Sequence, residues 1–209
     1  YVTCSNEFIE SEWWLIKEID KKGLIYYGNK VLPYCPRCGT ELSANEVGQG
    51  YQEDSVNTVI VPFKIKDSDT YFLVWTTTPW TLMANVALCV NPDLEYIKVS
   101  SMGYKFIVAK SLANKVLGDD FEVLETYKGT DLVGTNYEQL MPFAEVEGKC
   151  FEVLADSYVT SEDGTGIVHI APAYGDDDNR VCKENGIGFV NPVGKDGCYT
   201  CLLYTSDAA

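Results

Sequence analysis

The 209-residue sequence has no apolar run close to the ~18 to 20 residues that a membrane-spanning helix requires, and no charged-then-apolar leader. We therefore expect a soluble globular protein with no membrane partner. Basic residues are also scarce: 16 Lys and Arg stand against 31 Asp and Glu, for a formal net charge of −15. Because an acidic surface repels a phosphate backbone, the chain alone should hold nucleic acid poorly.

Paired cysteines are few. Of the eight cysteines only Cys35 and Cys38 form a CxxC pair, and the other six are scattered, which suits a reduced, cytoplasmic protein better than a disulfide framework. Two thiolates on the turn CPRCGTELS supply half of a tetrahedral zinc site. Either the other ligands lie outside this sequence or the two are ordinary reduced thiols. A redox role is disfavoured because no βαβ pattern accompanies the pair.

Residues 1–50 differ in pattern from the rest of the chain. Apolar residues at helical spacing predict an amphipathic helix over residues 5–22, with Ser5 as its N-cap and Gly23 at its end. A short-strand and turn region around the two cysteines follows. Because the sequence begins at Tyr1 without a methionine and soon enters this helix, we interpret it as part of a longer protein, with residues 1–50 as a connecting segment.

Residues 51–200 are predicted to form a mainly β domain with peripheral helices. Runs rich in β-branched and aromatic residues, bounded by turn residues, predict strands over residues 56–65, 70–78, 85–90, 96–110, 121–129, 149–160 and 166–172. A hairpin turn is expected at Ser101-Met102-Gly103, a short helix over residues 111–118 and a helix start after Gly175. Short strands at this spacing favour a barrel or a sandwich. Residues 201–209 break the pattern, and we interpret them as a non-native tail.

The stretch WTTTPWTLMAN, Trp75 to Asn85, directly follows the apolar run YFLV. One interpretation is a strand that ends in a proline turn, with the threonine hydroxyls bonded to local backbone. Strand alternation, however, sends Thr76 and Thr78 to one face and Thr77 to the other, so at least one hydroxyl points inward. An inward hydroxyl needs a partner, and water or a substrate would serve.

The one histidine of the chain, His169, stands at the end of an apolar strand in GTGIVHIAPAYGDDD. It is either a satisfied core residue or part of a site, since strand ends and loops are where sites usually form. Asp176, Asp177 and Asp178 follow the next loop. Three interpretations are open for these aspartates: a solvated helix terminus, a site for a divalent ion, or a carboxylate that holds a substrate ammonium. The loop lacks the alternating oxygen ligands of a calcium site, which disfavours the second.

Together, these two motifs resemble the editing domain inserted into the catalytic domain of isoleucyl-tRNA synthetases. The flanks agree: SNEFIESEWWLIKEIDKKGLIYYGNKVLPYCPRCGTELS is similar to the segment leading into the insertion, and GTDLVGTNYEQLMPF to its middle. The resemblance covers residues 1 to about 200. It is specific, because the related valyl and leucyl enzymes carry a different threonine-rich sequence with arginine. It implies a β-barrel editing domain of the valyl, isoleucyl and leucyl-tRNA synthetase type over residues 51–200.

The implied activity is hydrolysis of valine wrongly esterified to isoleucine tRNA. Isoleucine against valine is the standard illustration that one missing methylene is worth only about 1 to 3 kcal/mol of selectivity, so that a second, smaller site must remove the error. The ester carries an α-ammonium, so the site needs an anion, a held water and donors for the developing oxyanion. The resemblance implies attack by a water that the vicinal ribose hydroxyl assists, without a covalent nucleophile.

The resemblance also assigns roles to individual residues. Asp178 would hold the ammonium, and His169 would line the pocket rather than act as a general base. The threonines and Asn85 would shape the wall and orient the water and the terminal adenosine. The implied catalytic residues are Thr76, Thr77, Thr78, His169 and Asp178, and the implied substrate-binding residues are Trp75, Thr81, Asn85, Asp177 and Gly166. Met83 departs from the family pattern, which has proline at this position.

No cofactor is implied for editing. Zinc at Cys35 and Cys38 is a candidate in the parent enzyme, and ATP and Mg²⁺ would serve its synthetic domain, whose ATP-binding motifs this sequence lacks. The expected partner is the 3′ end of isoleucine tRNA carrying valine, bound by a cytoplasmic monomer whose tRNA affinity comes mostly from other domains. The alternative is a non-catalytic, zinc-stabilised β module that binds a tRNA end or a protein.

Overall fold

The computed structural model of the chain describes residues 2–200, and these residues divide into two compact units between Lys30 and Val31. Residues 201–209, for which we predict a non-native tail, lie outside the described residues. No helix in residues 2–200 is long and apolar enough to cross a membrane.

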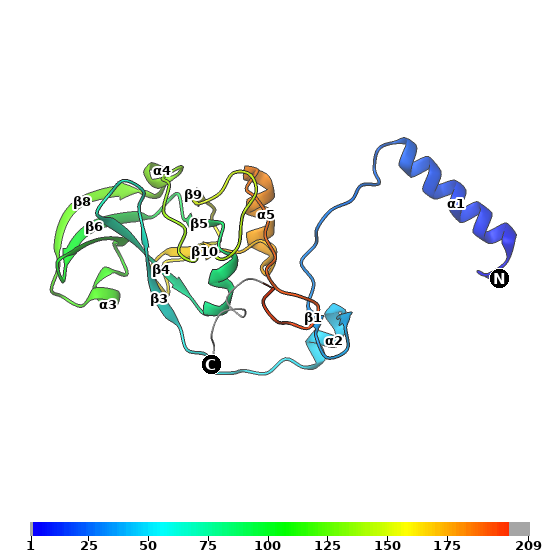
Figure 1. Cartoon of the computed structure of the whole chain (residues 1–209), viewed down its shortest axis with the longest axis horizontal. Helices are drawn as coiled ribbons and strands as arrows, with labels where there is room; N and C mark the ends of the chain where they lie inside the picture. The colour runs from blue at the N-terminus through cyan, green and yellow to red at the C-terminus, as the bar shows by residue number, and fades with distance from the viewer. Residues whose placement is uncertain (1, 201–209) are drawn as a thin grey trace. The chain divides into compact units, whose positions relative to one another are not determined.

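Within its described residues, the first unit forms one helix, α1 (Asn6–Lys21), drawn in blue in Figure 1. The Ser5 hydroxyl accepts a hydrogen bond of 3.4 Å from the Phe8 N–H, and Gly23 takes a φ of 67° just after the helix. Capping by a serine at the start and a left-handed glycine at the end is what the sequence predicts. The predicted helix is therefore confirmed.

The second unit begins with a small hairpin and a short helix. Strand β1 (Tyr34–Cys35) pairs antiparallel with β2 (Thr40–Glu41), and α2 (Ala44–Gln49) follows. A capping box starts α2: the Ser43 hydroxyl accepts from the Glu46 N–H at 3.3 Å, and the Glu46 carboxylate accepts from the Ser43 N–H at 2.7 Å. The predicted turn region around the two cysteines is thus present.

An eight-stranded sheet forms the body of the second unit, and its strands run in the order β8-β6-β7-β4-β10-β5-β9, with β3 also paired to β4. The strands are β3 (Val59–Lys64), β4 (Thr70–Thr76), β5 (Ala87–Val90), β6 (Glu95–Ser101), β7 (Tyr104–Ala109), β8 (Glu122–Lys128), β9 (Glu152–Ala155) and β10 (Ile167–Ile170). The predicted mainly β fold with peripheral helices is confirmed.

Strand β4 is the branch point of this sheet. It pairs antiparallel with β3 over residues 71–76, parallel with β7 over residues 70–72, and parallel with β10 at Trp75. Strand β7 pairs only with the first part of β4, and β10 pairs only near its end. The strands β7 and β10 therefore diverge along β4, and the sheet is curled, as Figure 1 shows. Because β4 and β10 pair in parallel at Trp75 and Val168, their carboxyl ends lie side by side.

Short helices complete the unit: η1 (Pro79–Ala84, a 3₁₀ helix), α3 (Ala113–Leu117), α4 (Gly129–Leu132) and α5 (Asp176–Asn185). Helix α4 contacts both β8 and β9, the two end strands of the sheet, and so helps to complete the barrel-like curl. The prediction did not include α4. Helices α3 and α5 lie where the sequence predicts them.

Two strand boundaries show how turn chemistry decides the ends of elements. The hairpin between β6 and β7 turns at Met102 (φ 53°) and Gly103 (φ 82°), where the sequence predicts it, and two left-handed residues are what a tight hairpin requires. The strand predicted over residues 149–160 is shorter, because Asp156 accepts a hydrogen bond of 3.0 Å from the Tyr158 N–H and turns the chain after β9.

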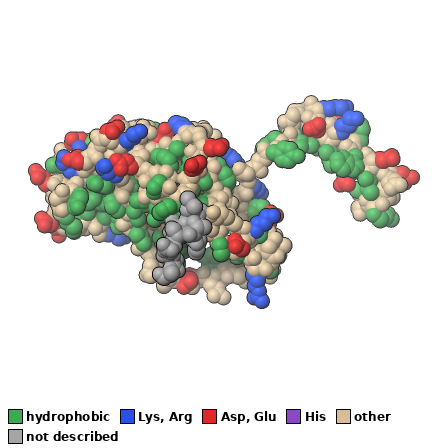
Figure 2. Space-filling model, in the orientation of Figure 1, with side chains coloured by type: hydrophobic (Ala, Val, Ile, Leu, Met, Phe, Trp, Pro, Cys, Tyr) green, Lys and Arg blue, Asp and Glu red, His purple; other side chains and the backbone are tan. Residues whose placement is uncertain are grey.

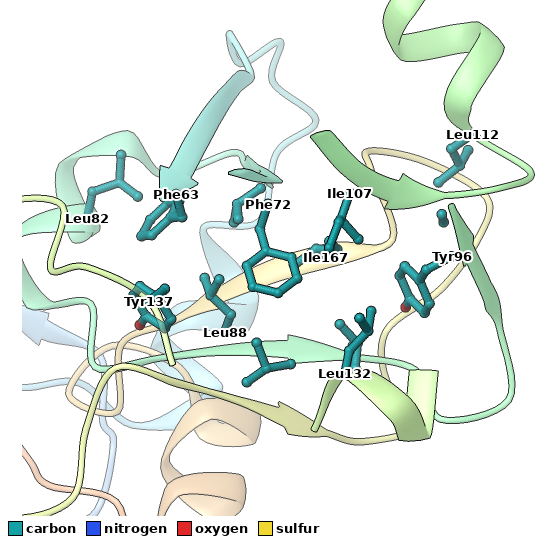
Figure 3. Packing of buried hydrophobic residues seen from close by; sticks show 14 residues of the cluster. Phe63, Phe72, Leu82, Leu88, Tyr96, Ile107, Leu112, Leu132, Tyr137 and Ile167 are labelled. Atoms are coloured by element: carbon teal, nitrogen blue, oxygen red, sulfur yellow. The ribbon is translucent and has the colours of Figure 1, made fainter. Parts of the chain in front are cut away.

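The main core fills the inside of the curled sheet. Figure 3 shows side chains from β3, β4, β5, β6, β7 and β10 pointing toward one another, with Phe63 and Phe72 fully buried. A second cluster lies on the opposite face of β5, β9 and β10, where Val86, Ile170 and Val181 pack together under α5. Strand β5 is buried on both faces, which explains why its sequence is apolar without alternation.

The surface carries both signs of charge. On the face in Figure 2, Lys and Arg side chains lie interspersed with Asp and Glu. Most ion pairs are exposed, such as Lys105 with Asp69 at 2.7 Å and Lys115 with Asp163 at 2.6 Å. Exposed pairs of this kind stabilise a fold by only about 0 to 1 kcal/mol each, so the buried apolar clusters hold the domain together.

Candidate functional site

The candidate site lies where β4 and β10 end. The two strands pair in parallel at Trp75 and Val168, which brings the residues after each strand to one edge of the sheet. A cavity of about 650 Å³ opens there. It is lined by Trp75, Thr76, Thr77, Thr78, Trp80, Thr81, Val168, His169, Ala171, Tyr174, Gly175, Asp178, Val193, Gly197 and Tyr199. Both motifs singled out in the sequence thus contribute to one cavity, although about ninety residues separate them.

The predicted alternation of the threonines does not hold. Thr76, Thr77 and Thr78 all line the cavity, because β4 ends at Thr76 and η1 begins at Pro79. Beyond the end of a strand the side chains no longer alternate between faces. The proline at the first position of η1 fixes this change, since its missing N–H and fixed φ suit a helix start.

Three of the threonine hydroxyls form one hydrogen-bonded chain. The Oγ1 atoms of Thr76 and Thr78 lie 3.4 Å apart, and those of Thr78 and Thr81 lie 3.1 Å apart. Thr76 Oγ1 also accepts from the Thr78 N–H at 3.0 Å, and the Thr81 hydroxyl donates to the Thr78 carbonyl at 2.8 Å. The Thr77 hydroxyl makes no hydrogen bond with any described residue, so it is available to a bound molecule.

The chain of hydroxyls ends at His169. Thr81 Oγ1 lies 3.0 Å from Nε2 of His169, while Nδ1 is buried without a hydrogen-bond partner among the described residues. Burial lowers the pKa of His169 to about 4, because the charged imidazolium is poorly solvated there. The ring is therefore neutral at pH 7, and it is a weak base.

Asp178 supplies the negative charge of the cavity. It stands in the first turn of α5, and its Oδ2 accepts a hydrogen bond of 2.9 Å from the Ala171 N–H. Burial raises the pKa of Asp178 to about 6. The hydrogen bond from the Ala171 N–H acts in the opposite direction and lowers this pKa, but burial has the larger effect. Asn179 also donates to the Pro172 carbonyl at 2.8 Å, so α5 and the loop before it hold the carboxylate in place from both sides.

Three residues with implied substrate-binding roles do not line the cavity. Asn85 is buried, donates from Nδ2 to the Ala87 carbonyl at 2.8 Å and accepts from the Tyr137 hydroxyl at 2.6 Å. Gly166 has a φ of 72°, and a Cβ there would come within 2.4 Å of the Ala109 Cβ, so the fold itself requires glycine. Asp177 is exposed and pairs with Arg180 at 3.2 Å.

Aromatic residues at the cavity were missed by the sequence reasoning. Trp80 lines the cavity with 58% of its surface exposed, and Tyr174 and Tyr199 also contribute. The Tyr199 hydroxyl donates a hydrogen bond to the Trp80 carbonyl. Trp80 and Tyr174 stand inside the two motifs, but a sequence does not distinguish an aromatic ring on a cavity wall from one in the core. No local signal indicated Tyr199.

The cysteine pair lies on the turn between β1 and β2. The Cys38 N–H donates to the Cys35 sulfur at 3.4 Å, and this hydrogen bond lowers the pKa of the Cys35 thiol. Hydrogen bonding with Cys35 raises the pKa of Cys38. Among residues 2–200 no group of three or more His, Cys, Asp or Glu side chains could hold a metal ion. The half zinc site at the two thiols, and zinc binding by the parent enzyme, stay predictions.

Comparison of the sequence with protein families decides the family. A family model of the class I tRNA synthetases for isoleucine, leucine, methionine and valine (I, L, M and V) matches residues 1–170. The chain belongs to this family. Similar sequences include the isoleucine–tRNA ligase of Clostridium tetani (strain Massachusetts / E88), which is 49% identical over 198 residues. The isoleucine–tRNA ligase of Bacillus thuringiensis (strain Al Hakam) is also 49% identical, over 201 residues. The matches cover 94% and 96% of this chain but 19% of each relative, so the chain spans about a fifth of the length of these curated relatives.

Two solved structures share the fold of the second unit's sheet in part. The crystal structure of GlLeuRS-CP1 matches with a TM-score of 0.53 at 19% identity, over 63% of each chain. The editing domain of the P. knowlesi cytosolic leucyl-tRNA synthetase matches with a TM-score of 0.51 at 15% identity, over 62% of this chain and 64% of that one. The predicted fold type, a β-barrel editing domain of this synthetase group, is confirmed at the level of the fold.

Proposed function

We propose that residues 51–200 form an editing domain of an isoleucine–tRNA ligase and hydrolyse the ester of valine on isoleucine tRNA. One observation carries this proposal: a buried carboxylate, Asp178, faces the same cavity as the threonines that follow β4. The relatives named isoleucine–tRNA ligase and the fold shared with a leucyl-tRNA synthetase editing domain support it.

Asp178 would bind the α-ammonium of the esterified amino acid. The ionised form of Asp178 is costly where it has no cationic partner, since burial raises its pKa to about 6. An ammonium at hydrogen-bond distance would replace water as the partner of the charge and would form a charge-assisted pair. A ligand without the ammonium would leave the carboxylate unpaired, so the site would select amino-acid esters.

The threonine wall would hold the attacking water. The Thr77 hydroxyl is available, and Thr76 and Thr78 add oxygen atoms with free lone pairs. His169 is neutral at pH 7 and too weak a base, with a pKa of about 4, to activate water efficiently. These properties support attack by water with help from the ribose hydroxyl next to the ester.

The exposed indole of Trp80 would provide a stacking surface for the terminal adenine, because nucleobases stack on aromatic side chains at about 1 to 3 kcal/mol per base. The rest of the tRNA would be bound by other parts of the parent enzyme, since the net charge of −15 opposes strong binding of phosphate by this chain. We propose a monomer that acts in the cytoplasm and needs no cofactor for this hydrolysis.

The experiment is deacylation of Val-tRNA for isoleucine by the full-length synthetase that contains this sequence. Asp178→Asn keeps the acceptor for the Ala171 N–H but removes the charge. We expect deacylation to fall by about 100-fold or more, because losing one partner of a buried ion pair costs about 3 kcal/mol or more. Glu184→Gln, which removes an exposed carboxylate from the other end of α5, is the matched control and should retain the wild-type rate.

Unchanged deacylation by Asp178→Asn would refute the assignment of the ammonium site. Absence of deacylation by the wild-type enzyme, together with one tightly bound zinc per chain, would instead favour the alternative, a non-catalytic β module. No third metal ligand lies near the cysteine pair among the described residues, which speaks against that alternative.

A further inference from the structure

The three hydrogen bonds of Thr81 Oγ1 determine which atom donates in each of them. A hydroxyl has a single proton, and an oxygen–oxygen contact of 2.8 Å requires a proton between the two atoms. The Thr78 carbonyl is only an acceptor, so the Thr81 proton lies on the 2.8 Å contact to that carbonyl. Thr81 Oγ1 then has only lone pairs left for its other two neighbours.

Both neighbours of Thr81 Oγ1 must therefore donate to it. The Thr78 hydroxyl donates across 3.1 Å, and the His169 Nε2–H donates across 3.0 Å. Thr76 completes the chain by donating to Thr78 Oγ1, since the Thr78 proton is already used. Every donor and acceptor in the chain is then used consistently.

We propose that Thr81 is a positioning residue that holds His169 as the neutral Nε2–H tautomer, so that the single N–H of the ring is bonded to Thr81 and is not available to a bound ligand. His169 would then line the cavity without donating a hydrogen bond to the oxyanion. This inference deepens the proposed function, on which the identity of the ligand rests.

Two further observations support the inference. Nδ1 of His169 is buried and has no partner among residues 2–200, and an unsatisfied buried acceptor costs about 1 to 3 kcal/mol. No acceptor among these residues lies at Nδ1 to compete with Thr81 Oγ1 for the ring proton. Burial also keeps the ring neutral, because it lowers the pKa of His169 to about 4. A neutral imidazole has one donor and one acceptor, and Thr81 decides which nitrogen is which.

The test uses the fact that the 209-residue chain has one histidine, so its imidazole gives one set of ¹⁵N resonances. At pH 7, long-range ¹⁵N–¹H correlations of the free wild-type chain should show a protonated Nε2 and an unprotonated Nδ1. A protonated Nδ1, or an even mixture of tautomers, would overturn the proposal. This measurement needs neither substrate nor activity, so it stands apart from any failure of the proposed function.

Variants test the part played by Thr81. Thr81→Val keeps the shape but removes the hydroxyl, and we expect it to produce a mixture of tautomers, whereas Thr81→Ser should retain the Nε2–H form. Thr165→Val is the matched control: Thr165 is also buried and bonded to backbone, to the Ile167 carbonyl at 3.0 Å, and its loss should leave the tautomer unchanged. An unchanged tautomer in a folded Thr81→Val would also overturn the proposal.

A titration with a non-hydrolysable valyl-adenosine amide tests whether the tautomer persists beside a ligand. Nε2 should stay protonated when the amide binds, because Thr81 Oγ1 remains its acceptor. Transfer of the ring proton to Nδ1 on binding would overturn the proposal, and absence of binding would count against the proposed function while leaving the tautomer result intact. In the parent enzyme, deacylation by Thr81→Val should fall about tenfold in kcat with little change in KM, and Thr81→Ser should restore it.

Discussion

The phenol hydroxyl of Tyr137 donates a hydrogen bond of 2.6 Å to Oδ1 of Asn85, across 52 positions of sequence. Both side chains are buried, and the Asn85 Nδ2 donates to the Ala87 carbonyl at 2.8 Å. Asn85 closes η1, which carries Thr81, so this pair fixes the turn beneath the threonine wall. Tyr137 itself is held edge-on against Phe63, with ring centroids 5.5 Å apart (Figure 3).

We expect Tyr137→Phe to destabilise the domain by about 1 to 3 kcal/mol. The variant keeps the ring but leaves Oδ1 of Asn85 buried without a donor, which costs the desolvation of that atom. The measurement is urea unfolding of the wild-type chain and the variant. Tyr127→Phe is the matched control, since the Tyr127 hydroxyl bonds to the exposed Glu125, and it should change stability by less than about 0.5 kcal/mol. Equal stability of Tyr137→Phe and wild type would contradict the structural role.

Asp178→Asn should increase the free energy of unfolding above pH 6, although we expect it to lower the proposed activity. The pKa of Asp178 is about 6 in the folded chain against its usual 3.8, so the unfolded state releases this proton first. The free energy of unfolding therefore falls as pH rises from about 4 to 6, by up to about 3 kcal/mol. In Asp178→Asn this group does not titrate, so the variant does not lose this part of its free energy of unfolding.

Urea unfolding between pH 4 and pH 8 measures the effect. The two chains should have similar stability near pH 4, and the variant should be more stable above pH 6. Glu184→Gln should show no such pH-dependent difference from wild type. A variant that is less stable than wild type at pH 8 would mean that the charge of Asp178 stabilises the fold, contrary to its burial.

Local patterns were enough to predict many elements of the fold. The helix α1, the turn at Met102 and Gly103, and the apolar strand β5 each depend on residues close together in sequence. The ends of strands were less well predicted, because single hydrogen bonds decide them. For example, the hydrogen bond from the Tyr158 N–H to the Asp156 carboxylate forms a turn directly after β9 and so ends this strand.

The site could be predicted as a set of motifs but not as an arrangement. Which hydroxyls face the cavity depends on where β4 stops, and the pairing of Trp75 with Val168 depends on a contact between distant strands. Asn85 shows the limit most clearly. Its position in the motif predicts a substrate contact, and the hydrogen bond that its side chain accepts from Tyr137, far away in sequence, could not be predicted from the motif.

Zinc should bind weakly to this chain. Cys35 and Cys38 supply two thiol ligands, and no third ligand joins them among the described residues, whereas a structural zinc site has four. After incubation with zinc and gel filtration, we expect well below one zinc per chain. Replacing both cysteines with serine gives the background value. One zinc retained per wild-type chain, lost in the double variant, would show that the ligand set is complete.

His169 should make the chain less stable in weak acid. Its pKa is about 4 when folded against 6.5 ordinarily, so only the unfolded state takes up a proton between these values. The free energy of unfolding should fall by about 1.4 kcal/mol per pH unit as pH decreases from 6.5 toward 4. His169→Asn removes this component, and because the chain has no second histidine, the difference between the two chains isolates it. A constant difference across this range would contradict the burial of the ring.

Thr77 offers the sharpest test of how the cavity would reject the cognate isoleucyl ester. Its side chain lines the cavity without a hydrogen bond to the described chain, so its methyl and hydroxyl can be changed separately. Thr77→Ser removes only the methyl and should let the isoleucyl ester enter, lowering the preference for valyl over isoleucyl ester by about tenfold or more, in the range that one methylene is worth. Thr77→Val keeps the size but loses the hydroxyl, and it should still reject the isoleucyl ester while hydrolysing the valyl ester more slowly.

The measurement is kcat/KM for Val-tRNA and Ile-tRNA in the full-length enzyme. Thr77→Ala combines both changes and should be slow and unselective, so the three variants separate the size of the wall from its hydrogen bonding. If Thr77→Ser and Thr77→Ala both still reject the isoleucyl ester, another residue of the cavity sets its size. If Thr77→Val hydrolyses the valyl ester at the wild-type rate, the water is held elsewhere, and the bonded hydroxyls of Thr76 and Thr78 become the groups to test.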